Sequence, residues 1–168
     1  MEISHTALHC RSDYIAMPDG IRLAASVWLP QKHSEQPDQY AAVLTTTRYW
    51  RAAALHQDSP EFQAYYPLAH YLLKRGYILV AVDARGSGAS FGCRETEFSP
   101  AEVEDIGSVI EWIAKQPWCD GRVATVGTSY TANTTLCSLV TAPPALKVGV
   151  CRAPDFDFYR HIFAPGGI

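Results

Sequence analysis

The sequence has no long hydrophobic run, no excess of positive charge and no regular cysteine pattern. No apolar stretch reaches the ~18 residues of a transmembrane helix, and residues 1–11 lack the apolar core of a signal peptide, so we expect a cytoplasmic protein without a membrane partner. Fourteen Lys and Arg against seventeen Asp and Glu leave a net charge of −3, which argues against nucleic-acid binding. Five cysteines without a C-x-x-C pair are not a disulfide framework.

The composition instead fits one folded domain. The 168 residues are 48% apolar and 18% charged, which excludes a disordered chain. A chain of this size buries roughly 70% of its unfolded surface, which is enough for one core. We therefore expect residues 1–12 to form an N-terminal tail and residues 13–168 to form one domain.

Short apolar runs alternate with helix-like segments along the chain. Pro18-Asp19-Gly20 is a turn signal and predicts an antiparallel hairpin over residues 13–30. Ser99, followed three residues later by Glu102, is a capping box that opens a helix. The other expected elements are strands at 41–47, 77–82, 122–126 and 146–151, and helices at 62–75 and 130–140. This order predicts a mostly parallel α/β sheet with helices on both faces and a leading antiparallel hairpin.

The sharpest chemical signal is Gly127-Thr128-Ser129-Tyr130-Thr131, between an expected strand and an expected helix. A G-x-S-x-G elbow places a serine on a strained strand-to-helix turn with its hydroxyl exposed. The backbone N–H of the next residue, Tyr130, then faces a developing oxyanion, and the helix N-terminus adds a partial positive charge. We expect Ser129 to be a nucleophile. The alternative is that the Ser129 side chain caps the helix. Thr131 stands where the motif has its last glycine.

Four further segments resemble one known family. They are residues 17–30 (MPDGIRLAASVWLP), 83–90 (DARGSGAS), 111–123 (EWIAKQPWCDGRV) and 155–167 (DFDFYRHIFAPGG). The chain from about residue 13 is similar to the N-terminal half of the Xaa-Pro dipeptidyl-peptidase (S15) and cocaine-esterase family. This resemblance implies an α/β-hydrolase fold, here truncated after about the sixth strand. It also implies a serine hydrolase that cleaves an ester or a peptide or amide bond through an acyl-enzyme, without a metal or other cofactor.

The resemblance also implies roles for single residues. Ser129 matches the nucleophile, and Tyr130 matches the residue whose backbone N–H binds the oxyanion. Tyr49 lies near the tyrosine whose hydroxyl is the second oxyanion donor, although the family's Pro-Tyr pair is Arg48-Tyr49 here.

A triad acid and a histidine base are expected beyond this segment of the family. Asp155 and His161 are the nearest substitutes, but only six residues separate them, and we do not expect them to form a triad with Ser129. The alternative function is therefore a truncated non-catalytic remnant or a partner-dependent binding module. The strand at 146–151 is then an exposed sheet edge, open to self-association or to a missing C-terminal half.

Overall fold

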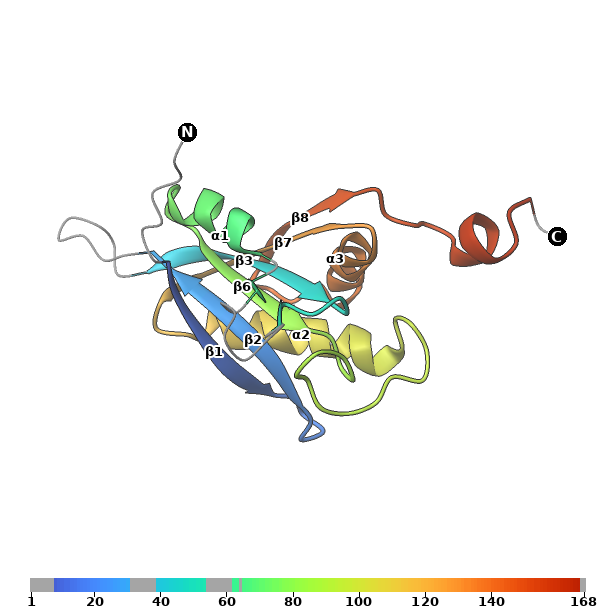
Figure 1. Cartoon of the computed structure of the whole chain (residues 1–168), viewed down its shortest axis with the longest axis horizontal. Coiled ribbons are helices and arrows are strands. Elements are labelled where there is room, and N and C mark those ends of the chain that lie inside the picture. The colour runs from blue at the N-terminus through green and yellow to red at the C-terminus, as the bar shows by residue number, and fades with distance from the viewer. Residues whose placement is uncertain (1–7, 31–38, 54–61, 64, 167–168) are drawn as a thin grey trace.

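A six-stranded sheet forms the centre of the structure, with the strand order β1-β2-β6-β3-β7-β8 (Figure 1). The computed structural model describes residues 8–30, 39–53, 62–63 and 65–166. The six strands are β1 (His9–Ala16), β2 (Arg22–Leu29), β3 (Tyr40–Thr47), β6 (Ile78–Asp83), β7 (Cys119–Thr128) and β8 (Leu146–Arg152). A separate two-stranded ribbon pairs β4 (Ala52–Ala53) with β5 (Phe62–Gln63).

The expected hairpin and parallel sheet are both confirmed. β1 pairs antiparallel with β2, and β2 pairs antiparallel with β6. All remaining pairs in the sheet are parallel. Gly20 has a φ of +84° and closes the hairpin by donating its N–H to the carbonyl of Met17 at 2.9 Å. β1 starts at His9, so residues 9–12 belong to the sheet and not to a tail. Residues 1–7 lie outside the described residues.

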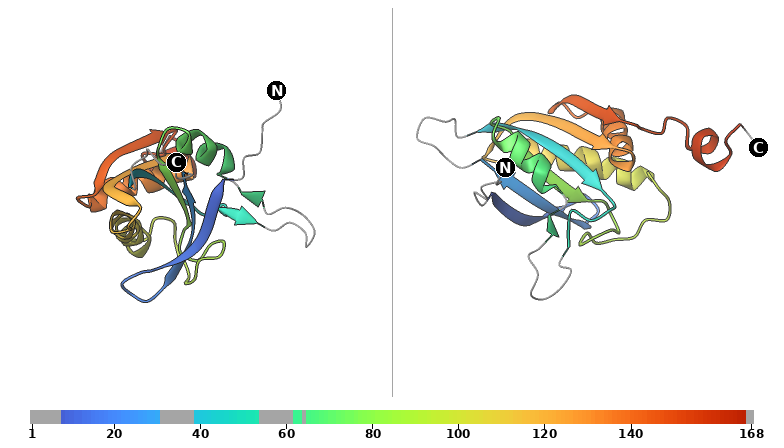
Figure 2. Two further views of the ribbon diagram at one scale, coloured as in Figure 1. Left: turned by 90° about the vertical axis from the view of Figure 1, so that its left-hand side faces the viewer. Right: turned by 45° about the horizontal axis from the view of Figure 1, so that its top comes forward.

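Helices cover both faces of the sheet, as expected (Figure 2). α1 (Tyr66–Leu73) packs on one face, while α2 (Pro100–Ala114) and α3 (Tyr130–Thr141) pack on the other. The prediction of a helix over 62–75 is wrong at its start, because Phe62 lies in β5 and the helix begins at Tyr66. Pro67 explains the difference: proline fits the first turn of a helix but breaks its interior.

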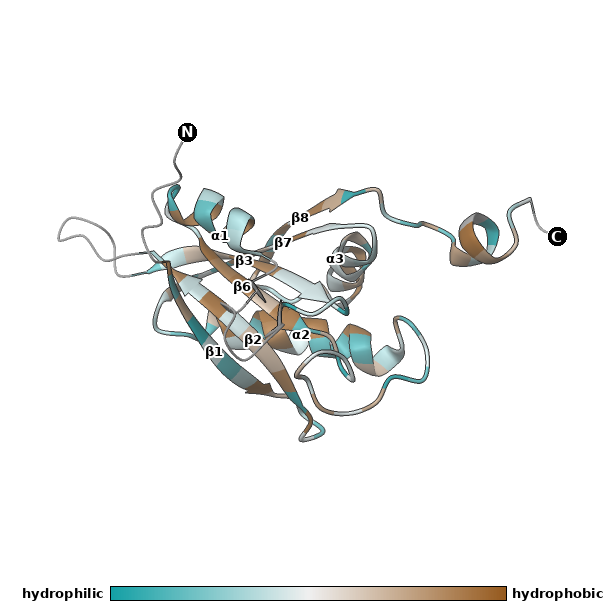
Figure 3. Cartoon of the chain, viewed as in Figure 1, coloured by the Kyte–Doolittle hydropathy of each residue, from teal (hydrophilic) through white to brown (hydrophobic). Residues whose placement is uncertain are grey.

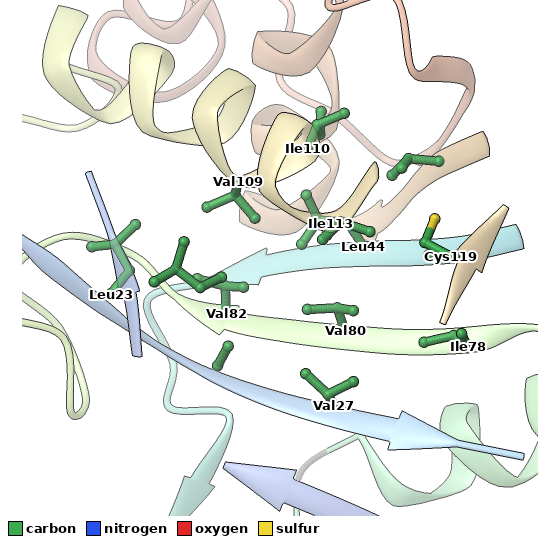
Figure 4. Close-up of a cluster of buried hydrophobic side chains, with 14 of the residues drawn as sticks. Leu23, Val27, Leu44, Ile78, Val80, Val82, Val109, Ile110, Ile113 and Cys119 are labelled. Carbon is green, nitrogen blue, oxygen red and sulfur yellow. The ribbon is translucent and has the colours of Figure 1, made fainter. Parts of the chain in front are cut away.

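Alternating side chains of the central strands build two apolar layers, because successive strand residues point to opposite faces. Val80 and Val82 of β6 pack towards Ile110 and Ile113 of α2 (Figure 4). Leu79 and Ala81, which alternate with these two valines along β6, pack towards Ala69 of α1. All four of these β6 residues are fully buried. The continuous apolar colour of β6 in Figure 3 reflects this burial on both faces.

β8 forms one edge of the sheet, which agrees with the expectation for residues 146–151. Val148 and Val150 are about half exposed, at 50% and 54%. Beyond β8 the chain leaves the sheet and ends in a short π-helix, η1 (Tyr159–Phe163), which lies apart from the strands (Figure 1). Phe156 and Phe163 on this segment are 90% and 76% exposed. Both the sheet edge and the C-terminal segment therefore expose apolar side chains.

Candidate active site

Ser129 occupies a strained turn between β7 and α3. Its backbone has φ 58° and ψ −125°, a region that residues other than glycine rarely adopt and that costs of order 1–3 kcal/mol. The Ser129 carbonyl accepts the N–H groups of Ala132 at 2.9 Å and Asn133 at 3.1 Å, which starts the helix. The side chain makes no capping hydrogen bond and is exposed. The structure therefore contradicts the alternative in which the Ser129 side chain caps α3.

Gly127 allows the end of the strand to touch the start of the helix. A Cβ atom added at Gly127 would lie 2.0 Å from the backbone carbonyl carbon and oxygen of Thr131. No side chain fits at that distance, and the clashing atoms are backbone atoms that cannot rotate away. The first glycine of the motif is thus required by close packing of β7 against α3.

Thr131 fits the position at which the motif has glycine. Its hydroxyl accepts the N–H of Thr128 at 2.7 Å and donates to the carbonyl of the same residue at 2.9 Å. Thr131 is 8% exposed, so these two bonds satisfy polar groups that would otherwise be largely removed from water. The β-branched side chain of Thr131 therefore stabilises the elbow and does not disrupt the turn.

Tyr130 projects its ring into the protein directly after Ser129. The ring stacks on Phe98 at a centroid distance of 5.0 Å and meets the edge of Tyr49 at 5.7 Å. Its hydroxyl donates to the carboxylate of Glu102, a residue of the first turn of α2 that is 1% exposed. Burial, followed by this hydrogen bond, raises the pKa of the Tyr130 hydroxyl, which stays protonated and can donate. Burial also raises the pKa of Glu102.

Tyr49 lies on the loop that follows β3, and its backbone N–H donates to the Thr47 hydroxyl at 3.0 Å. Asp83, at the end of β6, anchors this loop by accepting the N–H of Arg51 at 2.8 Å. Its second oxygen accepts the N–H of Ala89 at 3.0 Å. Asp83 is 1% exposed, so one buried carboxylate joins the loops that follow two neighbouring strands. Tyr49 itself is 56% exposed.

All three predicted site residues line one pocket of about 490 Å³. Ser129 and Tyr130 contribute the elbow, and Tyr49 contributes the opposite loop. Phe158, Ile162 and Phe163 add an apolar wall, and the polar lining comes from Arg48, Thr96, Glu97, Asn133 and Asp155. A serine hydroxyl, a helix N-terminus and a phenol on one cavity are three of the groups that acyl transfer uses; a base is also needed.

Comparison with known proteins identifies the family of the chain. The family profile described as X-Pro dipeptidyl-peptidase (S15 family) matches residues 19–168, which is most of the chain. The chain belongs to the S15 family. It is therefore a member of a hydrolase family, as its sequence motifs predict.

Named relatives of the S15 chain include an esterase and a peptidase. A protein of Mycobacterium bovis, named as a candidate serine esterase, is 37% identical over 166 residues that cover 94% of this chain and 26% of the relative. The Xaa-Pro dipeptidyl-peptidase of Lactobacillus helveticus is 30% identical over 125 residues, covering 64% of this chain and 15% of the relative. The S15 chain thus spans about a quarter or less of the length of these relatives.

Solved structures establish the fold. The CocE/NonD family hydrolase of Staphylococcus aureus superposes with a TM-score of 0.75 and 25% identity, covering 91% of this chain and 29% of that protein. Together with the sheet order and the helices on both faces, this match confirms an α/β-hydrolase fold that is truncated relative to its neighbours.

No base for Ser129 can be assigned among the described residues of the S15 chain. Asp155 lines the pocket, and its backbone N–H donates to the Asn133 side chain at 2.9 Å. The side chain of His161 lies outside the described residues. Among the described residues, no histidine lines the pocket. Within the same residues, no three His, Cys, Asp or Glu side chains gather as metal ligands, and no helix has the length and apolar character needed to span a bilayer.

Sequence analysis missed three residues of this site. Asn133 lies four residues after Ser129, one turn along α3, so helical spacing could have indicated that both face one side. Glu102 is identified in the sequence only as part of a capping box; the Ser99 hydroxyl does accept its N–H, at 3.3 Å, but its carboxylate contacts the N–H of Phe98 and the Tyr130 hydroxyl. Glu97 lies on an irregular loop, where no spacing rule applies.

Proposed function

We propose that this chain carries the nucleophile and the oxyanion-binding groups of a serine hydrolase that cleaves an ester bond or a peptide or amide bond. One observation carries the proposal: Ser129 holds a strained positive-φ conformation at a strand–helix junction, with an exposed, uncapped hydroxyl inside the pocket that Tyr49 and Tyr130 also line. Strain of this kind concentrates at functional sites.

The reaction begins when the Ser129 Oγ attacks the carbonyl carbon of the substrate. The serine proton passes to a base, and the carbonyl oxygen becomes an oxyanion. In our proposal the Tyr130 backbone N–H and the Tyr49 hydroxyl donate to that oxyanion, and the N-terminus of α3 adds a partial positive charge. Collapse expels the alcohol or amine and leaves an acyl-enzyme, which water then hydrolyses.

The base and its orienting acid are proposed to lie outside these 168 residues. Two observations support this: among the described residues no histidine lines the pocket, and the chain spans only 26% of its M. bovis relative. The Ser129 hydroxyl is a weak nucleophile without a base, so we expect the 168-residue chain alone to be inactive. A non-catalytic binding module is the less favoured alternative, since such a module has no need for a strained serine.

Ester and peptide substrates remain two proposals, and the ester is favoured. The relative with the higher identity, 37% over 94% of this chain, is named as a candidate serine esterase, whereas the dipeptidyl-peptidase relative is 30% identical over 64%. The apolar wall of Phe158, Ile162 and Phe163 fits a small uncharged acyl or alcohol group.

The test compares hydrolysis of p-nitrophenyl esters and of Xaa-Pro p-nitroanilides by the protein at the full length that its gene encodes. We expect ester turnover to exceed amide turnover, and Ser129→Ala to abolish both. Ser108→Ala, in α2 and outside the residues that line the Ser129 pocket, is the matched control and should retain activity. Turnover that survives Ser129→Ala would contradict the proposal.

A further inference from the structure

A continuous chain of charged side chains connects the hydroxyl of Tyr130 with the hydroxyl of Tyr49. At one end, Arg94 donates to the Tyr130 hydroxyl at 3.3 Å. At the other end, Arg48 donates to the Tyr49 hydroxyl at 3.4 Å. Both arginines meet on one carboxylate oxygen, Oε1 of Glu97: Arg94 lies 3.7 Å from it, and Arg48 forms an ion pair with it. Among the described residues, Glu97 is thus the acidic group that joins the two halves.

The Tyr130 end of this chain is buried and fixed. Glu102 is 1% exposed and receives the Tyr130 hydroxyl and the N–H of Phe98. The Arg94 guanidinium lies 3.9 Å from the Glu102 carboxylate and balances its charge in the interior. A buried carboxylate with two hydrogen bonds and a cationic neighbour has little freedom to move, so Tyr130 is held in one position.

The Tyr49 end is open to solvent and depends on its partners. The Tyr49 ring is 56% exposed, and its contacts are the edge of Tyr130 and the guanidinium of Arg48. The Arg48 Cζ lies 5.1 Å from the centre of the Tyr49 ring and 5.0 Å from that of Tyr130, so the cation lies against both rings. A long arginine side chain holds such a place only when its head group is bound, and Glu97 binds it.

We propose that Glu97 is a positioning residue that holds Arg48 against the two tyrosines and so keeps the Tyr49 hydroxyl aimed at the oxyanion; this inference rests on the function proposed above. Glu97 lies on the loop that enters α2 and lines the same pocket as Ser129.

Removing the Glu97 charge has two effects on the reaction rate, and they act in opposite directions. Loss of a negative charge near the oxyanion would by itself speed the reaction. Loss of the hold on Arg48 and Tyr49 would slow it. Because Glu97 is 38% exposed, solvent screens its direct charge effect, and the positioning effect should dominate.

The experiment measures the second-order rate constant for phosphonylation of Ser129 by a neutral fluorophosphonate, in the protein at its gene-encoded length. The Ser129 Oγ–P bond forms, the P–F bond breaks, the serine proton passes to the base, and the phosphoryl oxygen occupies the oxyanion site. We expect Glu97→Gln to lower this rate about three- to fivefold, the size of a lost exposed ion pair. Glu97→Asp should recover part of it. Glu95→Gln, an exposed residue with the same charge change two positions away, should leave it unchanged.

A double-mutant cycle separates positioning from a general structural effect. If Glu97 acts through Tyr49, Glu97→Gln should have no further effect in a Tyr49→Phe background. A higher phosphonylation rate in Glu97→Gln would overturn the proposal. A double variant whose rate loss equals the product of the two single losses would also overturn it.

A second readout does not need a working nucleophile. 3-Fluorotyrosine placed at position 49 should show a ¹⁹F shift in Glu97→Gln and none in Glu95→Gln. If Ser129 in the unmutated protein is not labelled, the proposed function fails, and the ¹⁹F spectrum alone decides whether Glu97 holds Tyr49. An unchanged ¹⁹F spectrum, or a shift without any change in the labelling rate of an active protein, would overturn the inference.

Discussion

Gly127 is the position in the elbow that tolerates least change. We expect Gly127→Ala to lower the free energy of unfolding by about 2–3 kcal/mol, because the new methyl group would lie 2.0 Å from backbone atoms of Thr131. Denaturant unfolding measures the difference. Gly121→Ala is the control: its φ is +84° but nothing lies within 4 Å, so only backbone strain of about 1 kcal/mol applies. Equal losses in the two variants would contradict the close-packing argument.

The proposed reacting groups were predicted from the sequence, but the residues that contact them were not. Ser129 and Tyr130 were predictable because a strand, a small-residue turn and a helix follow one another in sequence. Tyr49 required the family resemblance. The contact of Glu102 with Tyr130 joins residues 28 apart and depends on how α2 packs against α3, which no local pattern encodes. The fit of Thr131 likewise depends on a hydrogen bond that only the folded elbow provides.

At the scale of elements, the first turn of α2 supports the start of α3 through Glu102, and this support should depend on pH. Burial raises the pKa of Glu102 above 4.5, its ordinary value, so the folded state binds its proton more tightly than the unfolded state. The linkage slope is then negative: the contribution of Glu102 to stability is present in full below its unfolded pKa and decreases as pH rises through its folded pKa.

The matching measurement is the unfolding midpoint of the unmutated chain and of Glu102→Gln from pH 4 to pH 8. We expect the stability of the unmutated chain relative to Glu102→Gln to fall as the pH rises. Glu104 is an exposed neighbour on the same helix, and the unfolding midpoint of Glu104→Gln should change with pH as that of the unmutated chain does. A difference that grows with pH would mean that the ionised carboxylate is the favoured form.

Element boundaries were predicted less well than element types. The strand at His9–Ala16 starts four residues before residue 13, where the hairpin was expected to begin, because its first residues, His9 to Ser12, are polar or small and lack an apolar alternation. The helix that begins at Tyr66 was predicted four residues too early, although Pro67 marked its first turn. The strand order, with β6 between β2 and β3, rests on pairings between distant segments and was not predicted from the sequence.

At the scale of the whole molecule, the outer edge of β8, the last strand of the sheet, should control self-association of the chain. Val148 and Val150 are half exposed on an edge strand, and such an edge is a template for pairing with another chain. We predict that the 168-residue chain, prepared alone, self-associates through β8. In light scattering, a Val148→Lys, Val150→Lys variant should be monomeric under conditions where the unmutated chain is not.

Val140→Lys is the matched control, because Val140 is 77% exposed but belongs to α3 and not to the edge strand. It should associate as the unmutated chain does. A monomeric unmutated chain, or dissociation by Val140→Lys alone, would contradict the role of β8.

The most direct test of the account is to map the residue that a fluorophosphonate labels in the protein at its gene-encoded length. Digestion followed by mass spectrometry identifies the modified peptide. We predict a single adduct on Ser129, which is absent in Ser129→Ala and forms slowly or not at all in the 168-residue chain alone. An unlabelled Ser129, or an adduct on another serine, would contradict the assignment of this elbow as the nucleophile.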